Sequence, residues 1–374
     1  MDDRRWPVWV RLLIHRPWSI VHRLPFLTRH GFLFTVYGLT MVFMDGVLII
    51  DKPAGLTSHD VVARVRRILG ERRVGHTGTL DPFATGVLVI LVGRATRLAQ
   101  FLSGAEKEYE AVIRLGYATD TGDLTGTPIH DTQSAEAPTS VDVKVCPYKA
   151  PSDEEIESAI AGMRGGIDQI PPMYSAKKHQ GRKLYELARS GQEIERAAVR
   201  VMIHEFETSP RDGVLLTENE DGTCDLPVRV VCSAGTYIRT LAEDLGRRLG
   251  VGAHLVALSR TRAGDFRITD AVSLEELQRM VADQNLSDRI LPTDAALSRL
   301  PLLHLTAGDA ERARNGVPVS VETDAPADWV NGERVRMCGQ HGGLIAIGFF
   351  DAATRTLQPR VVLAPEIVAR ASRP

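Results

Sequence analysis

The pattern of apolar and polar positions predicts that helices and strands alternate in the first third of the chain. The apolar run at residues 47–50 predicts a buried strand, and the β-rich run at residues 86–92 predicts another. Between them, Ser58 can cap a helix that Gly70 is suited to end. The apolar positions of this helix recur at helical spacing: Val61, Val62, Val65, Ile68 and Leu69.

Further helices are predicted in the middle of the chain, and the predicted secondary structure changes toward its C-terminal end. Residues 152–155 form a capping box, and Ser273 with Glu276 forms another, each at the start of a predicted helix. A helical stripe also begins directly after residues 235–237. It consists of Ile238, Leu241, Leu245 and Leu249. After about residue 301 the chain changes to short β runs with many Gly and Pro residues, which predicts a small separate β domain.

The first 43 residues have a different character. Residues 4–30 carry six arginines, and residues 31–44 carry no charge. This pattern is compatible with a basic amphipathic anchor or a signal sequence. However, a run of 14 residues is too short to span a bilayer, and no small-residue cleavage site follows it. We therefore expect residues 1–43 to be an extension that is disordered, or that lies upstream of the native start at Met41 or Met44.

Composition and charge limit the classes of protein. At 374 residues two domains are expected, and 25% charged residues is ordinary for globular proteins. The net charge of −2 provides no global basic field, so any nucleic acid must be bound by local patches. Residues 164–200 are such a patch, with eight Lys or Arg residues against four acids.

Cysteine usage argues against disulfides and against a metal site. The four cysteines are scattered and have no spacing typical of zinc ligands: Cys146, Cys224, Cys232 and Cys338. Free thiols in a reducing cytoplasm fit this pattern best.

Asp81 is the first residue with candidate chemistry. It ends a loop rich in Gly and Thr, residues 75–82, and such an Asp-Pro pair is by itself most often a turn. Five arginines stand just before the loop against a single acid, Glu71: Arg64, Arg66, Arg67, Arg72 and Arg73. These arginines form either a solvated helix face or a rim that faces phosphates. A carboxylate beside cations stays ionised, as a nucleophile or proton acceptor requires.

Six segments resemble, in order and at the same spacing, the TruB family of tRNA pseudouridine synthases. They are GVLIIDKPAGLTSHD, RRVGHTGTLDPFATGVL, KEYEAVIRLGYATDTGD, IPPMYSAKKHQGRKLYELAR, CSAGTYIRTLAEDLG and GAHLVALSRTRAGDF. The resemblance extends from about Gly46 to Arg360. The GHTGTLDP and GTYIRTL motifs are highly specific. The loop between Gly126 and Ser152 is longer than in the usual family pattern, and the first forty residues have no counterpart.

The resemblance implies roles for individual residues. Asp81 matches the catalytic aspartate, Arg239 matches its cationic partner, and Tyr109 matches the aromatic residue that stacks on the flipped uridine. Further positions match substrate contacts: Lys52, His76, Tyr237 and Leu258. Residues 164–191 resemble an RNA-gripping insertion whose basic side chains are Lys177, Lys178, Arg182 and Lys183. The final stretch resembles a PUA domain, which contacts the acceptor end of tRNA.

Several alternatives stay open from the residues alone. Tyr109 at the start of a strand is by default a packing residue, and Arg239 can pair with Glu243 across one helical turn. Tyr237 and Leu258 can both be core. Asp81 either attacks the ribose or assists departure of the base, and Tyr237 or Tyr109 can shuttle the proton.

The resemblance implies an isomerase that converts uridine to pseudouridine in the T-arm of tRNA, at position 55. The base is flipped out, and its glycosidic bond is broken and re-formed without a cofactor or metal. We expect a cytoplasmic monomer that binds tRNA and no membrane. Two rival functions are a non-catalytic tRNA-binding or folding chaperone, and a hydrolase that uses an aspartyl nucleophile on a small substrate.

The predicted fold class is α+β. We expect a mixed-sheet pseudouridine synthase catalytic domain at residues 44–300, with an RNA-binding insertion at residues 164–191. A small β-rich PUA-like domain at residues 301–374 follows it.

Overall fold

The computed structural model describes most of the chain. The described residues are three short strands before residue 45, and residues 45–129, 149–175, 177–179, 181–192, 194–210, 212–321, 326, 328–340 and 342–363. The chain divides into two compact units, residues 1–44 and residues 45–374.

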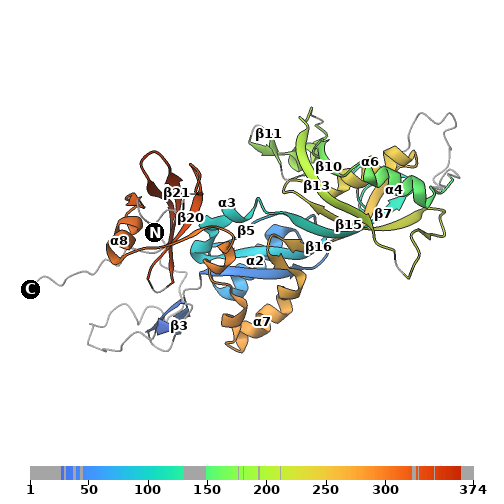
Figure 1. The fold of residues 1–374 in the computed structure, drawn as a ribbon. Helices are drawn as coiled ribbons and strands as arrows, with labels where there is room; N and C mark the ends of the chain where they lie inside the picture. The colour runs from blue at the N-terminus through green and yellow to red at the C-terminus, as the bar shows by residue number, and fades with distance from the viewer. Residues whose placement is uncertain are drawn as a thin grey trace, which may run out of the picture. The chain divides into compact units, whose positions relative to one another are not determined.

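A ten-stranded mixed sheet forms the centre of the second unit (Figure 1). Its main path runs through β10 (Gly165–Gln169), β13 (Val199–Thr208), β15 (Cys224–Cys232), β7 (Lys107–Leu115), β16 (Ala253–Ala263), β6 (Thr85–Val92) and β4 (Gly46–Lys52). Three short strands pair at its margins: β5 (Val74–His76), β14 (Thr217–Glu218) and β17 (Phe266–Arg267). This mixed sheet, with helices packed beside it, confirms the predicted α+β fold class.

Along the main path of the sheet, the pairing of β16 with β6 involves the fewest residues. These two strands are parallel and pair only through Ser259 with Thr85 and Arg260 with Gly86. Gly86 has a φ of +97°, and a Cβ atom there would lie 2.3 Å from the carbonyl oxygen of Arg260. Glycine is therefore required at this contact. The loop that carries Asp81 leads directly into β6, so it lies at the junction between the two halves of the sheet.

Each half of the sheet has its own helices and its own core. On one half, α4 (Asp153–Ala161) and α6 (Ile238–Leu249) pack together, and their apolar residues join β7, β13, β15 and β16 in one cluster. On the other half, α2 (Ser58–Leu69) contacts β5 and α7 (Leu274–Ala282). Alternation along β7 directs Tyr109 and its odd-numbered neighbours toward the first cluster, because successive side chains point to opposite faces.

The predicted capping boxes are confirmed at Ser152 and Ser273, which accept hydrogen bonds from the amides of Glu155 and Glu276. The expected cap at Ser58 is wrong by one residue. Thr57 forms the capping box of α2 instead, and its own amide donates to the side chain of Asp60. Ser58 is buried, and its hydroxyl accepts a hydrogen bond from the amide of Leu80.

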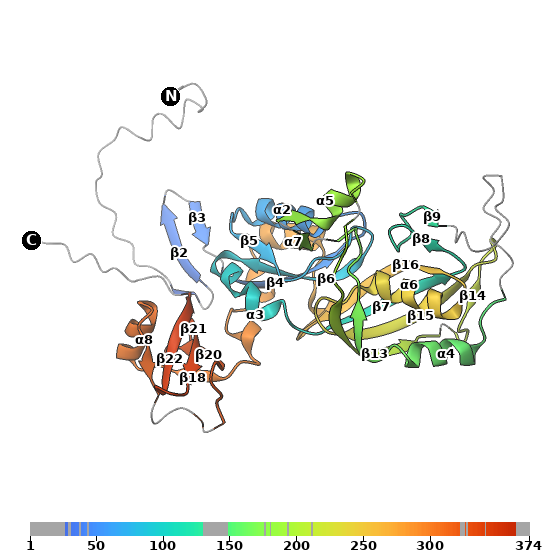
Figure 2. The same ribbon diagram turned by 90° about the horizontal axis from the view of Figure 1, so that it is seen from above.

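The predicted C-terminal β domain is present (Figure 2). Its five-stranded sheet has the order β18-β20-β21-β22-β19, and α8 (Ala307–Arg314) packs beside it. The strands are β18 (Leu302–His304), β19 (Val319–Ser320), β20 (Arg334–Cys338), β21 (Leu344–Asp351) and β22 (Thr356–Val362). This small β-rich fold fits a PUA-like domain.

The C-terminal sheet packs against the ten-stranded sheet. Ile347, Val361 and Leu363 share a buried cluster with residues of β4 and β6. Arg94 donates to the carbonyl oxygen of Leu363 at 2.7 Å and pairs with Asp45 at the start of β4. The boundary near residue 300 stays a prediction, because packing continues across it.

The first unit contains a three-stranded antiparallel sheet. It is made of β1 (Leu27–Thr28), β2 (Gly31–Val36) and β3 (Leu39–Val42). Other residues before Asp45 lie outside the described part of the chain, so the expected disorder of residues 1–43 stays a prediction. In the described residues, no helix has the length and apolar character needed to cross a membrane.

Candidate active site

The loop that carries Asp81 connects β5 to β6, and buried polar side chains hydrogen-bond to its backbone. The hydroxyl of Ser58 accepts from the amide of Leu80 at 2.9 Å and donates to its carbonyl oxygen. The ammonium of Lys52, which has no exposed surface, donates to the carbonyl oxygens of Ala84 at 2.6 Å and Pro82 at 3.2 Å. The backbone on both sides of Asp81 is thus fixed by hydrogen bonds.

Arg239 pairs with Asp81, as predicted, from the first turn of α6. Its Nε lies 2.9 Å from Oδ2 of Asp81, and its Nη2 donates to Oδ1 at 3.1 Å. Two parallel bonds of this kind fix the plane of the carboxylate as well as its position. The Arg239 side chain is 5% exposed, whereas that of Asp81 is 32% exposed. The alternative pairing with Glu243 is not formed; Glu243 pairs with Arg247 instead.

Backbone carbonyl groups hold the guanidinium of Arg239 from two other segments. Nη1 donates to the carbonyl oxygen of Thr121 at 2.8 Å, and Nη2 donates to that of Tyr174 at 2.7 Å. A second carboxylate, on Asp123, lies 3.7 Å from Nη1 and is 7% exposed. Asp123 is itself oriented by bonds from the Thr121 hydroxyl and from both the amide and the hydroxyl of Thr125.

These neighbours act on the ionisation of Asp81 in opposite directions. Burial raises the pKa of Asp81 and the nearby charge of Asp123 raises it further, whereas Arg239 and Lys52 lower it. Burial also lowers the pKa of Lys52 to about 8, although the negative charge of Asp81 opposes this shift. The pKa of the partly exposed Asp81 carboxylate is therefore set by opposing effects of burial and of the buried cations around it.

Tyr109 and Leu258 lie beside this pair in the core of the first cluster. Tyr109 is 8% exposed and Leu258 is 7% exposed, and both join Leu80 and Ala84 in that cluster. Packing is thus part of the role of both residues. Burial raises the pKa of Tyr109, and the nearby charge of Asp81 adds to that rise.

His76 lies five residues before Asp81 in the sequence, and Tyr237 lies two residues before Arg239. His76 ends β5, its ring lies 5.5 Å from that of His59, and its buried Nδ1 has no hydrogen-bond partner among the described residues. Burial, followed by the charge of His59, lowers the pKa of His76. Tyr237 precedes α6, and its amide and carbonyl groups both bond to the buried side chain of Gln169.

The predicted RNA-binding residues are only partly described. Lys177 is exposed, but the side chains of Lys178, Arg182 and Lys183 lie outside the described residues. Their backbone is described: β11 (Lys178–His179) and β12 (Arg182–Lys183) form a hairpin.

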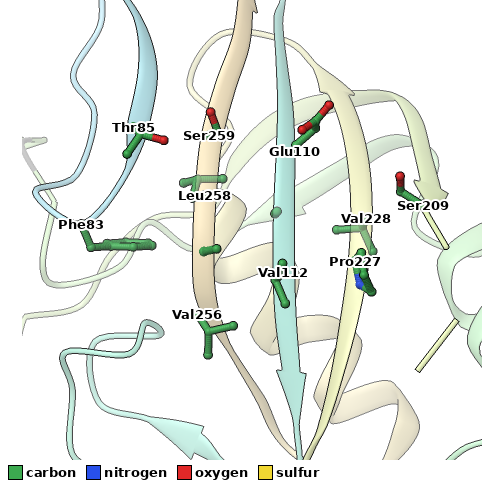
Figure 3. Close-up of a pocket in the computed structure, with 12 residues that line it drawn as sticks. Phe83, Thr85, Glu110, Val112, Ser209, Pro227, Val228, Val256, Leu258 and Ser259 are labelled. Carbon is green, nitrogen blue, oxygen red and sulfur yellow. The ribbon is translucent and has the colours of Figure 1, made fainter. Parts of the chain in front are cut away.

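A pocket of about 310 Å³ is lined by residues of β7, β15 and β16 and of the segment that leads into β6 (Figure 3). Figure 3 shows Glu110 and Val112 on β7 and, on the neighbouring β16, Val256 and Leu258 at its wall. Of the predicted site residues in the described ranges, Leu258 alone lines it. The Asp81–Arg239 pair is therefore not part of this pocket.

Three residues of the site were missed in the sequence: Ser58, Asp123 and Arg260. Arg260 is 2% exposed and donates to two carbonyl oxygens of the loop that carries Asp81. No group of His, Cys, Asp and Glu side chains suited to a metal ion occurs in the described residues, and the cysteines among them are free thiols. Cys146 lies outside the described residues.

Comparison with known proteins agrees with this geometry. In the solved structure of a Cbf5-Nop10-Gar1 complex, one chain matches with a TM-score of 0.62 and 26% identity, covering 86% of this chain and 85% of that one. The fold is therefore that of a pseudouridine synthase. A model of the TruB family pseudouridylate synthase N-terminal domain matches residues 66–238, and one of the tRNA pseudouridylate synthase B C-terminal domain matches residues 239–298.

Curated relatives settle the family. The tRNA pseudouridine synthase B of Geobacillus thermodenitrificans is 45% identical over 79% of this chain and 93% of its own length. The protein of the same name from Ralstonia nicotianae is 42% identical over 80% of this chain and 87% of its own. The chain belongs to the TruB family of pseudouridylate synthases.

Proposed function

We propose that this protein isomerises a uridine of tRNA to pseudouridine, at position 55 in the T-arm. The reaction breaks the bond between C1′ of the ribose and N1 of uracil and forms a bond between C1′ and C5. The proton on C5 leaves to solvent and N1 gains a proton, so the composition of the RNA does not change. Asp81 acts at the ribose side of this bond.

The observation that carries the proposal is the bidentate pair between Asp81 and Arg239. Arg239 is buried and fixed by four hydrogen-bonding contacts, while Asp81 keeps a third of its side chain exposed. A pair that served only stability would gain nothing from leaving its carboxylate open. A reactive carboxylate needs both this exposure and a fixed direction.

Recognition of the RNA rests on other groups. A uridine inside a folded arm must leave its stack before Asp81 can reach it. Stacking on an aromatic side chain is worth roughly 1–3 kcal/mol per base, which offsets part of that cost; Tyr109 is the proposed partner. The exposed arginines of α2 and the loop after it, with the insertion at residues 164–191, are the proposed phosphate contacts.

Asp81→Asn tests the proposal, because it keeps the size of the side chain and removes its charge. We expect no detectable tritium release from tRNA that carries 5-tritiated uridine, with tRNA affinity close to that of the wild type. Asp51→Asn is the matched control: Asp51 is an exposed carboxylate next to Lys52, and its loss should leave the rate unchanged.

Two outcomes would overturn the proposal in different ways. Substantial pseudouridine formation by Asp81→Asn would remove Asp81 from the chemistry. A wild-type protein that binds tRNA and forms no pseudouridine would instead support the tRNA-folding chaperone. Mapping the product by sequencing then decides whether the T-arm uridine is the one modified.

A further inference from the structure

Arg260 is a buried cation at the junction of the two halves of the sheet. It is 2% exposed, and its guanidinium donates to three backbone carbonyl oxygens: Val87 at 2.7 Å, Gly78 at 3.1 Å and Thr79 at 3.5 Å. Two of these carbonyl groups belong to the loop that carries Asp81. None of the ion pairs found in the described residues involves Arg260, so carbonyl groups rather than a carboxylate surround its charge.

The same residue also reaches Tyr109. Arg260 is opposite Gly86 in the pairing of β16 with β6 and opposite Tyr109 in the pairing of β16 with β7. These pairings make Arg260 and Tyr109 neighbours on adjacent strands. Burial raises the pKa of Tyr109, and the charge of Arg260 opposes that rise.

We propose that Arg260 is a positioning residue for the reaction, which holds the Tyr109 hydroxyl and the Asp81 loop in one fixed relation. This inference rests on the proposed function, because both groups are taken to act on the flipped uridine. The guanidinium bonds to the loop and stands on β16 opposite Tyr109, so it can resist a displacement of one relative to the other. Lysine cannot reproduce this arrangement, since it presents a single nitrogen instead of a planar fork.

Arg262 provides a matched control on the same strand. Its side chain is 14% exposed, and it pairs with Glu106 at 2.6 Å and with Glu108 at 3.5 Å. Glu108 lies on the face of β7 opposite Tyr109, and the bonds of Arg262 within the described residues go to these two acids and to Gly264 rather than to the catalytic loop. Arg262→Lys thus makes the same chemical change two residues away, outside the proposed arrangement.

The experiment compares Arg260→Lys, Arg260→Met and Arg262→Lys with the wild type. Single-turnover tritium release at saturating enzyme gives the rate, and filter binding gives the tRNA affinity. We expect Arg260→Lys to lose at least tenfold in rate and Arg260→Met to lose more, while affinity changes less than twofold. Arg262→Lys should stay within twofold in both. Circular dichroism and thermal melting check that each variant folds. If Arg260→Met does not fold, the comparison is made with Arg260→Lys alone.

A double-mutant cycle with Tyr109→Phe separates positioning from general support. We expect the penalty of Arg260→Lys to shrink at least threefold when the hydroxyl is absent; if Tyr109→Phe alone is inactive, the split between rate and affinity decides. An undiminished rate in Arg260→Lys, a loss confined to affinity, or equal losses with and without the hydroxyl would overturn the inference. Absence of product with the wild-type protein would instead refute the proposed function.

Discussion

Arg239→Lys tests how far catalysis depends on the geometry of the carboxylate rather than on charge alone. The guanidinium makes two bonds to Asp81 and one each to the carbonyl oxygens of Thr121 and Tyr174. A lysine ammonium keeps the positive charge, but from one nitrogen it can keep only one of the two bonds to Asp81 in this geometry. Asp81 then becomes free to rotate about the remaining contact.

The size of the effect follows from the bonds that are lost. A hydrogen bond to a charged group contributes roughly 1.5–3 kcal/mol. If that energy orients the carboxylate in the transition state, its loss lowers the rate roughly 10- to 150-fold. The carbonyl groups left without a donor should also lower the free energy of unfolding by roughly 1–3 kcal/mol.

Single-turnover tritium release measures the rate, and urea denaturation measures the stability. Arg247→Lys is the control, because Arg247 lies on the same helix and its pairs with Glu243 and Asp244 are on the surface, with its side chain 67% exposed. Exposed pairs of this kind are worth little, so the control should stay within a factor of two. A rate within threefold of the wild type for Arg239→Lys would show that charge suffices and that the bidentate geometry is dispensable.

Two further predictions concern the acid limb and the RNA surface. The proposed role of Asp81 requires its ionised form, so we expect activity to fall as pH drops through its pKa, which burial raises. Asp123→Asn removes a charge that raises this pKa, so the acid limb of the single-turnover rate should move to lower pH; an upward shift or none would contradict this sign. Replacing Lys177, Lys178, Arg182 and Lys183 with Ala should weaken tRNA binding. The slope of log K against log salt concentration should become shallower by roughly 0.7–0.9 per lost phosphate contact. An unchanged slope in filter binding would remove these residues from the phosphate surface.

The elements that the sequence predicted well are those with local signatures. Two of the three expected helix caps are correct. In the apolar stripe of α6, Ile238, Leu241 and Leu245 are buried and Leu249 is partly buried. The cap of α2 shows the limit of such reasoning. Thr57 and Ser58 are adjacent hydroxyl residues that both suit a cap, and the choice depends on Leu80, which bonds to Ser58 only in the folded chain.

The pair of Asp81 and Arg239 was accessible because both residues lie in specific motifs, although they are 158 positions apart. Asp123 ends one of the six segments that resemble the family, but it was missed because an Asp in a run of Thr, Gly and Asp residues is by itself typical of a loop. Its carboxylate gains a role when that loop closes against α6. Such a contact depends on tertiary structure and leaves no local pattern in the sequence.

The buried cations of the site show why its residues are easier to predict from the sequence than the bonds that they form. Lys52, Arg239 and Arg260 all donate to backbone carbonyl oxygens. A carbonyl group belongs to every residue type, so the partner side of these bonds has no signature in the sequence. The arrangement also has a chemical consequence. Because carbonyl groups satisfy these donors without neutralising their charge, positive charge persists around the loop and opposes the rise in pKa that burial imposes on Asp81. A carboxylate held this way can stay ionised at a site that water only partly reaches.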